Sequence, residues 1–183
     1  MERKSFTKLL VVFLCGVFIF ILKSNVFAAT KYAYSIGTDY STLFHSDIDT
    51  SQDAINAANI FGKLGYTSYY NVKPTVNYMK GNAPNGSRRL GCEIVFLSGH
   101  GNSQLMSFNY KRKGGDYGTG IIQGRDWKSK DTGYTYAGVK DCNMSKTKLF
   151  VLAGCQTAKG SNNITRDVVK NGADSAVGWQ KKC

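Results

Sequence analysis

The sequence has few prolines, histidines and acidic residues. Their scarcity argues against a proline-rich linker and a zinc site, and it leaves a large excess of positive charge. Two prolines in 183 residues leave no proline-rich linker, and together with 20 glycines they favour a single loop-rich α/β domain with a real core. Two histidines, without any Cys-x-x-Cys or Cys/His spacing, argue against a zinc site, and we expect neither a metal nor another cofactor. Twelve acidic residues against 24 basic ones give a formal net charge of +12.

The excess of positive charge favours contact with an anionic surface, such as a polyanionic cell wall or lipid head groups. The basic residues are scattered along the chain, and no recognition-helix or RNA-binding signature accompanies them, so nucleic acid is not expected as a partner. A solvated basic surface is the simpler interpretation of the same charges.

Residues 1–28 have the pattern of a signal peptide. A net positive start precedes an apolar run over 9–22, and Val26-Phe27-Ala28 places small residues at 26 and 28, which indicates cleavage before Ala29. An uncleaved anchor is the alternative, but the run is shorter than the roughly 20 residues that a spanning helix needs. We therefore expect a secreted or extracytoplasmic protein associated with the cell envelope, with residues 29–183 as one domain. Cleavage removes four Lys/Arg and one Glu, which lowers the formal net charge from +12 to +9.

Two continuously apolar stretches, Ile94–Leu97 and Leu149–Ala153, are predicted to be central parallel strands buried on both faces. Each is followed by a glycine-containing turn, and these turns carry His100 and Cys155. Because open α/β sheets build their sites at the carboxyl ends of their strands, we expect His100 and Cys155 to lie side by side at one edge of the sheet.

An imidazole beside a thiol is the base and nucleophile of a cysteine hydrolase, in which the thiolate attacks an acyl carbon. The backbone N–H groups of Gly101 and Cys155 are candidates for an oxyanion hole, since the glycine allows a close approach to substrate. A structural role is the alternative for Cys155, because cysteine is among the most buried residue types.

The remaining pattern predicts alternating strands and helices. We expect a strand over 32–36, a helix from a cap at Thr50 or Ser51 to Leu64, a strand over 66–72 and a brief helix over 74–79. This order predicts a parallel sheet with helices on both faces.

The segment between His100 and Cys155 is harder to interpret. Apolar residues alternate at 106, 108 and 110, and 121–122 is a candidate return strand of an edge hairpin. After Cys155 we predict a helix that is capped by Ser161 or Asn162 and ends at Gly172, then a strand over 175–179.

The sequences SGHG (98–101) and AGCQTA (153–158), each after an apolar strand, resemble the His-Gly and Ala/Gly-Cys signatures of caspase-fold (clan CD) cysteine peptidases, most closely the CHAT-domain branch. The segment NGADSAVGW (171–179) is also similar to the one that follows the nucleophile helix there. The resemblance implies a three-layer α/β/α sandwich with a mostly parallel sheet, and a thiol protease that acts on protein or peptide substrates. Cys155 would be the nucleophile and His100 the general base and later acid.

The same resemblance assigns further roles. Gln156 and Thr157 match the family pattern after the nucleophile and would fix the turn by hydrogen bonds. Asp39 follows the first strand, where the family often places a contact to a basic P1 residue, although a turn residue is the simpler interpretation. Family members generally continue with at least one strand beyond the position of Cys183, so either the sheet is shortened or the sequence is a piece of a longer protein.

Two other functions stay open at this point. One is a catalytically inactive caspase-fold binding module at the cell envelope, and the other is an unrelated thiol-dependent hydrolase or acyltransferase. In an exported protein a disulfide among Cys92, Cys142 and Cys183 is compatible with a reactive Cys155, and the sequence leaves the pairing open.

Overall fold

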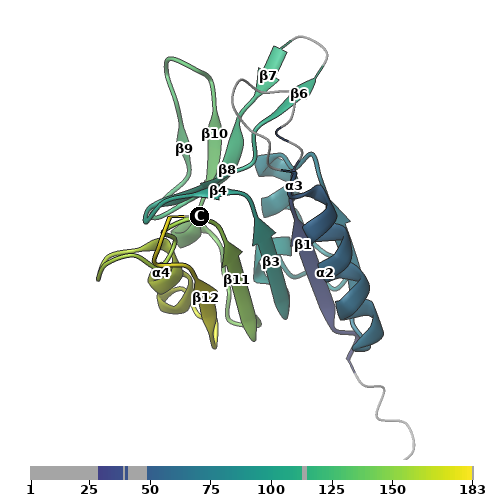
Figure 1. The fold of residues 1–183 in the computed structure, drawn as a ribbon. Coiled ribbons are helices and arrows are strands. Elements are labelled where there is room, and N and C mark those ends of the chain that lie inside the picture. Colours follow the sequence, from purple (N-terminus) through teal and green to yellow (C-terminus); the bar gives the residue numbers. More distant parts are fainter. Residues whose placement is uncertain (1–28, 39, 41–48, 113–114, 183) are drawn as a thin grey trace, which may run out of the picture.

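A computed structural model describes residues 29–38, 40, 49–112 and 115–182, and these form an α/β fold with two five-stranded sheets (Figure 1). The first sheet has the order β12-β11-β3-β1-β2, and all of its neighbouring pairs are parallel. Its strands are β1 (Tyr32–Ile36), β2 (Thr67–Asn71), β3 (Ile94–Ser98), β11 (Leu149–Ala153) and β12 (Ala176–Gly178). The predicted parallel sheet, with the two apolar strands at its centre, is confirmed.

Helix α2 (Ser51–Lys63) covers one face of this sheet and packs against β1, β2 and β3. Its buried side consists of Ala54, Ala57 and Ala58, whose small side chains let the helix lie close to the strands. Gly37 follows β1, and a Cβ there would lie 2.0 Å from the carbonyl oxygen of Thr50. The helix is thus held close to the carboxyl edge of the sheet.

The opposite face carries the main hydrophobic core. Val95 and Leu97 of β3 pack there with Phe150 and Leu152 of β11, and all four are buried. Helix α4 (Ile164–Lys170) adds Ile164 and Val168, and the second sheet adds Met106, Phe108 and Ile121. One face of the first sheet is therefore covered by α2 over β1, β2 and β3, and the other face packs against α4 together with the second sheet.

Burial of β11 is complete on one face only, which corrects the expectation of two buried faces. Phe150 and Leu152 are fully buried, whereas Leu149, Val151 and Ala153 are half-buried. The reason is that α2 packs against the other half of the sheet. On the same face, Val177 of β12 pairs with Val151 and is 47% exposed.

The second sheet has the order β4-β5-β8-β10-β9 and mixes parallel and antiparallel pairs. Its strands are β4 (His100–Gly101), β5 (Leu105–Ser107), β8 (Thr119–Ile122), β9 (Trp127–Lys128) and β10 (Thr135–Gly138), and a separate hairpin pairs β6 (Tyr110–Arg112) with β7 (Gly115–Tyr117). Met106 does pair with Ile121, as the alternation suggested, but inside a five-stranded sheet and not in an edge hairpin. His100 lies where the chain passes from one sheet to the other.

Short elements complete the chain, and two helix ends differ from the prediction. Helix α3 spans Val76–Lys80, with 3-10 turns at Arg89–Gly91 and Val139–Asp141. The side chain of Asn163, and not of Ser161 or Asn162, caps α4 by accepting from the N–H of Arg166 at 2.9 Å. At the end of α2, Leu64 is 66% exposed and not in the core.

The predicted signal peptide, residues 1–28, lies outside the described residues, and so does Cys183. Within the described ranges, none of the helices is both long and apolar enough to span a membrane. Cys92 and Cys142 are buried thiols in two different hydrophobic clusters.

Candidate active site

His100 and Cys155 follow two neighbouring strands at the same edge of the parallel sheet. The last registered pair between β3 and β11 is Ser98 with Ala153, so both residues lie two positions beyond a shared rung. The N–H of Gly99 donates to the carbonyl oxygen of Ala153 at 3.2 Å, which extends the pairing by one further bond. The prediction that these strands are adjacent and parallel is confirmed.

Two glycines bring the turns after these strands into contact. A Cβ on Gly101 would lie 2.9 Å from Cγ2 of Thr157 and 3.1 Å from the carbonyl oxygen of Cys155. A Cβ on Gly154 would lie 2.8 Å from the carbonyl oxygen of Gly99. Larger residues would therefore push the His100 and Cys155 turns apart, which explains why each turn contains a glycine.

Thr157 fixes the turn that carries Cys155. It is fully buried, and its hydroxyl lies 3.0 Å from the carbonyl oxygens of both Leu152 and Gly154, to one of which it donates. The same hydroxyl accepts the N–H of Trp179 at 3.1 Å. Gln156 adopts a left-handed backbone with φ of 58°, a conformation that non-glycine residues enter at a cost of order 1–3 kcal/mol and that clusters at functional sites. The expectation that hydrogen bonds fix this turn is confirmed for the Thr157 side chain, whereas Gln156 takes part through its backbone N–H and carbonyl groups.

Tyr40, which no sequence pattern marks as a site residue, supports His100. Its ring lies 4.4 Å from the imidazole, centroid to centroid, at 58°. Its hydroxyl accepts the backbone N–H of His100 at 3.0 Å and donates to the carbonyl oxygen of Ser107. The side chain is 2% exposed, and burial raises its pKa far above the ordinary value, so the hydroxyl stays protonated as a donor. Tyr40 therefore holds the backbone of His100 and one side of its ring.

A further hydrogen-bonded group joins α2 to the same edge. The hydroxyl of Thr50 lies 2.8 Å from the carbonyl oxygen of Ser98 and 3.0 Å from that of Thr38, instead of capping α2. Ser98 donates its own hydroxyl to the carboxylate of Asp53 at 2.8 Å. An acidic group thus lies beside the last residue of β3. Asp39, the candidate P1 contact, lies outside the described residues.

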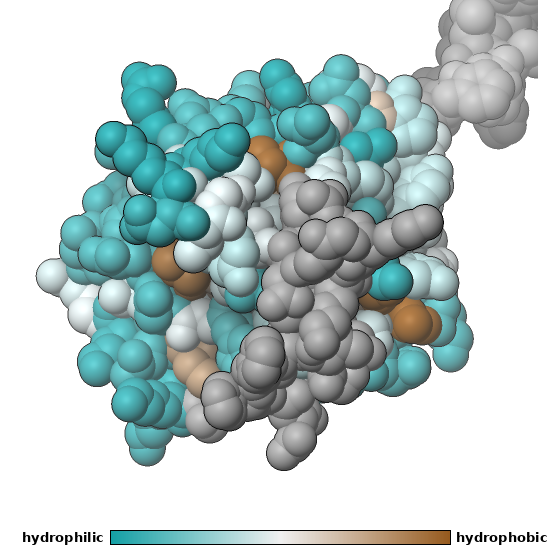
Figure 2. Space-filling model, turned by 90° about the horizontal axis from the view of Figure 1, so that it is seen from above, coloured by the Kyte–Doolittle hydropathy of each residue, from teal (hydrophilic) through white to brown (hydrophobic). Residues whose placement is uncertain are grey.

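Solvent reaches both candidate reactive groups. His100 is exposed and Cys155 is half-buried. Partial desolvation lowers the pKa of His100 from its ordinary value near 6.5, because an uncharged imidazole loses less on burial than an imidazolium. The imidazole is therefore neutral at pH 7 and can accept a proton. Outside the residues drawn in grey, the face seen in Figure 2 is mainly hydrophilic, with hydrophobic residues in small separate patches.

The lowered pKa of His100 can be tested directly. In an NMR titration the imidazole signal that is missing from His100→Gln should have a midpoint below 6.5. Because the folded pKa is the lower one, the native state should lose stability as pH falls from 6.5 to that midpoint, and His100→Gln should reduce this loss. A midpoint above 6.5 would contradict the desolvation and would indicate a neighbouring negative charge.

Comparison of the chain with protein-family models, curated proteins and solved structures found no match. Within the part of the chain that the structure describes, no group of three or more His, Cys, Asp or Glu side chains is placed to hold a metal ion.

Proposed function

We propose that this protein is an exported cysteine endopeptidase with a caspase-like three-layer fold, and that it acts through His100 and Cys155. One observation carries the proposal: β3 and β11 are neighbours in a parallel sheet, and each ends in a turn that presents one of these residues at the same edge. An imidazole and a thiol at such an edge form the base and nucleophile of this chemistry.

In the proposed reaction, His100 removes the proton of the Cys155 thiol. The thiolate forms a bond to the carbonyl carbon of a peptide, and the N–H groups of Gly101 and Cys155 bind the developing oxyanion. The carbon–nitrogen bond then breaks as the imidazolium returns its proton to the leaving amine. Water, deprotonated by His100, hydrolyses the thioester and restores the thiol.

Support for this assignment comes from how firmly the site is held. Tyr40 binds the backbone of His100, and the hydroxyl of Thr157 binds the backbone just before Cys155, at Leu152 or Gly154. Effective catalysis requires reacting groups to be fixed in place before the substrate arrives. A structural cysteine would not require a supported histidine beside its turn.

Alkylation of the native protein by iodoacetamide, followed by peptide mapping, tests the proposal. Cys155 should react near pH 7, because its neighbouring base activates it. Cys92 and Cys142 are internal controls, since burial raises their pKa values to about 12 and about 11, and both should stay unmodified.

The comparison with unfolded protein separates activation from mere exposure. In urea all thiols are accessible and none has a supported imidazole, so Cys155 should react more slowly there than in the native state. His100→Ala should remove that difference. If Cys155 resists alkylation in the native protein, the enzyme proposal is wrong and the inactive binding module is the better interpretation.

A further inference from the structure

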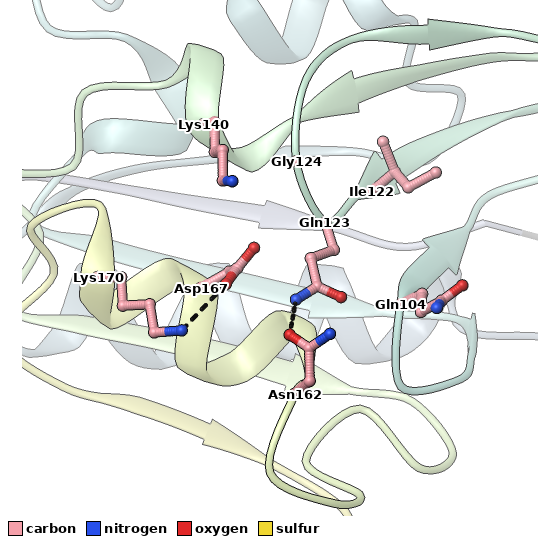
Figure 3. A pocket seen from close by; sticks show the side chains of 8 residues that line it. All are labelled: Gln104, Ile122, Gln123, Gly124, Lys140, Asn162, Asp167 and Lys170. Carbon is pink, nitrogen blue, oxygen red and sulfur yellow. Dashed lines mark hydrogen bonds and ion pairs between the residues drawn. The ribbon is translucent and has the colours of Figure 1, made fainter.

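A polar pocket of about 430 Å³ lies between α4 and the second sheet, and it includes neither His100 nor Cys155. Figure 3 shows its side chains, which come from the turn after β4, the end of β8 and the two residues that follow it, the second 3-10 turn, the loop before α4 and α4 itself. The polar members are Gln104, Gln123, Lys140, Asn162, Asp167 and Lys170. Its volume is in the range of small-molecule sites, but most such sites are largely apolar, so a ligand here would have to be polar over most of its surface.

Backbone hydrogen bonds fix the walls of this pocket. The N–H of Gln123 donates to the carbonyl oxygen of Gln104 at 2.7 Å, and that of Lys140 donates to Gly124 at 2.8 Å. The side-chain amide of Gln123 donates to Asn162 at 2.5 Å, which joins the second sheet to the loop before α4. The pocket is therefore already formed without a ligand.

Asp167 is the unusual member. Its side chain is 6% exposed, yet no described residue donates a hydrogen bond to its carboxylate, and its one ion pair is Lys170 at 3.9 Å. The carboxylate oxygens are not among the fully buried polar atoms that lack a partner, so the small exposed part of this side chain is open to the pocket and can accept a donor there. In Figure 3 the carboxylate points into the same space as Lys140 and Gln123. A ligand that supplied N–H donors would complete its coordination.

The lysines set a second requirement. Lys170 is 68% exposed, and Lys140 forms no ion pair within the described chain. With one carboxylate against two ammonium groups, the pocket has a formal charge of +1. A simple cation satisfies Asp167 but is repelled by both lysines, and a simple anion is repelled by Asp167. A neutral sugar leaves the charge of Lys140 unmatched.

We infer that this pocket binds a small zwitterion with a free ammonium group and a free carboxylate, that is, an amino acid or a short peptide. The ammonium group donates to Asp167, the carboxylate binds Lys140 and Lys170, and the amides of Gln104 and Gln123 accommodate the peptide group. This site is separate from the proposed catalytic pair and does not depend on the peptidase assignment.

Calorimetric titration of the full chain with alanyl-alanine tests the inference, with alanine as a second probe to distinguish a peptide from a free amino acid. N-acetylation of the dipeptide and amidation of its carboxylate should each weaken binding at least tenfold. Asp167→Asn should weaken the free dipeptide at least tenfold but leave the affinity for the N-acetylated form unchanged. Lys140→Ala should likewise weaken the free dipeptide at least tenfold, and it should leave the affinity for the amidated form unchanged.

Stability measurements keep this test clear of folding defects. Since Asp167 accepts no hydrogen bond from the described residues, Asp167→Asn should unfold at the same or a higher temperature than the parent. Asp174→Asn is the matched control, because Asp174 is 56% exposed and pairs with Lys148 outside the pocket. That control and Cys155→Ala should both bind the dipeptide normally.

Two results would overturn the inference. One is no binding of either probe at concentrations well above the millimolar range. The other is equal affinity for the free and the doubly blocked dipeptide, which would identify a site for neutral polar ligands. Loss of activity in Cys155→Ala has no bearing on either outcome, so this inference and the proposed function can fail separately.

Discussion

Cys155→Ala should abolish hydrolysis of every peptide that the protein cleaves, because no other group in the proposed mechanism can form the acyl intermediate. His100→Ala should lower kcat/KM by about 10²–10⁴-fold, the usual contribution of a general base. Neither change removes a buried side chain, so thermal unfolding should stay close to that of the parent. Peptides with a basic P1 residue are the first substrates to test, since Asp39 is the P1 contact that the family resemblance suggests and Asp53 lies beside Ser98 at this edge.

Cys142→Ala is the matched control for this measurement. It removes a thiol from the hydrophobic core instead of the carboxyl edge, so it should affect stability and leave the rate per folded molecule unchanged. If Cys155→Ala retains full activity, the activity belongs to a different site. If the parent cleaves no peptide in a broad library, the binding-module interpretation gains support.

Thr157→Val should destabilise the protein by about 2–3 kcal/mol, although the two side chains have nearly the same shape. The substitution removes a fully buried hydroxyl and leaves the N–H of Trp179 without its acceptor, as well as removing a bond to Leu152 or Gly154. For a domain of this size the melting temperature should fall by about 4–12 °C. The alkylation rate of Cys155 should fall as well, since its turn loses this support.

Thr157→Ser separates the hydroxyl from the methyl group. It keeps every hydrogen bond and loses only one buried methyl, worth about 1 kcal/mol. Denaturant unfolding of both variants, with the exposed Thr132→Val as a surface reference, measures the difference. If valine costs no more than serine, the hydrogen bonds of Thr157 are not what holds the turn.

The parallel sheet could be predicted because its central strands are continuous apolar runs, a pattern that buried strands share. The second sheet could not. Its strands have two to four residues, and parallel pairing of β8 with β10 depends on contacts formed only when the chain has folded. The prediction of the α4 cap was wrong for a local reason. Residues 161–163 are three consecutive polar residues that can each cap a helix, and in the structure the last of them, Asn163, is the cap.

The candidate site also contains residues that the sequence predicted and residues that it could not predict. His100, Cys155 and the glycines beside them follow from strand ends and small residues, which are local signals. Tyr40 acts on a histidine 60 positions away, and Asp53 meets Ser98 at a separation of 45, so neither partner is visible in the sequence around it. Asp167 has the sequence context of an ordinary first-turn helix residue, and only its burial marks it as unusual.

The turn after Cys155 is also tied to the segment that follows β12. The N–H of Gln156 donates to the carbonyl oxygen of Lys181 at 3.1 Å, and the N–H of Ala158 donates to that of Trp179 at 2.9 Å. The N–H of Trp179 donates in turn to the hydroxyl of Thr157. Because these three bonds join the same two short segments, 156–158 and 179–181, loss of one bond distorts the other two. The two segments therefore form one cooperative opening unit. Their amide hydrogens should exchange with solvent together, and a molecule that detaches residues 179–181 would loosen the loop around the thiol from a distance.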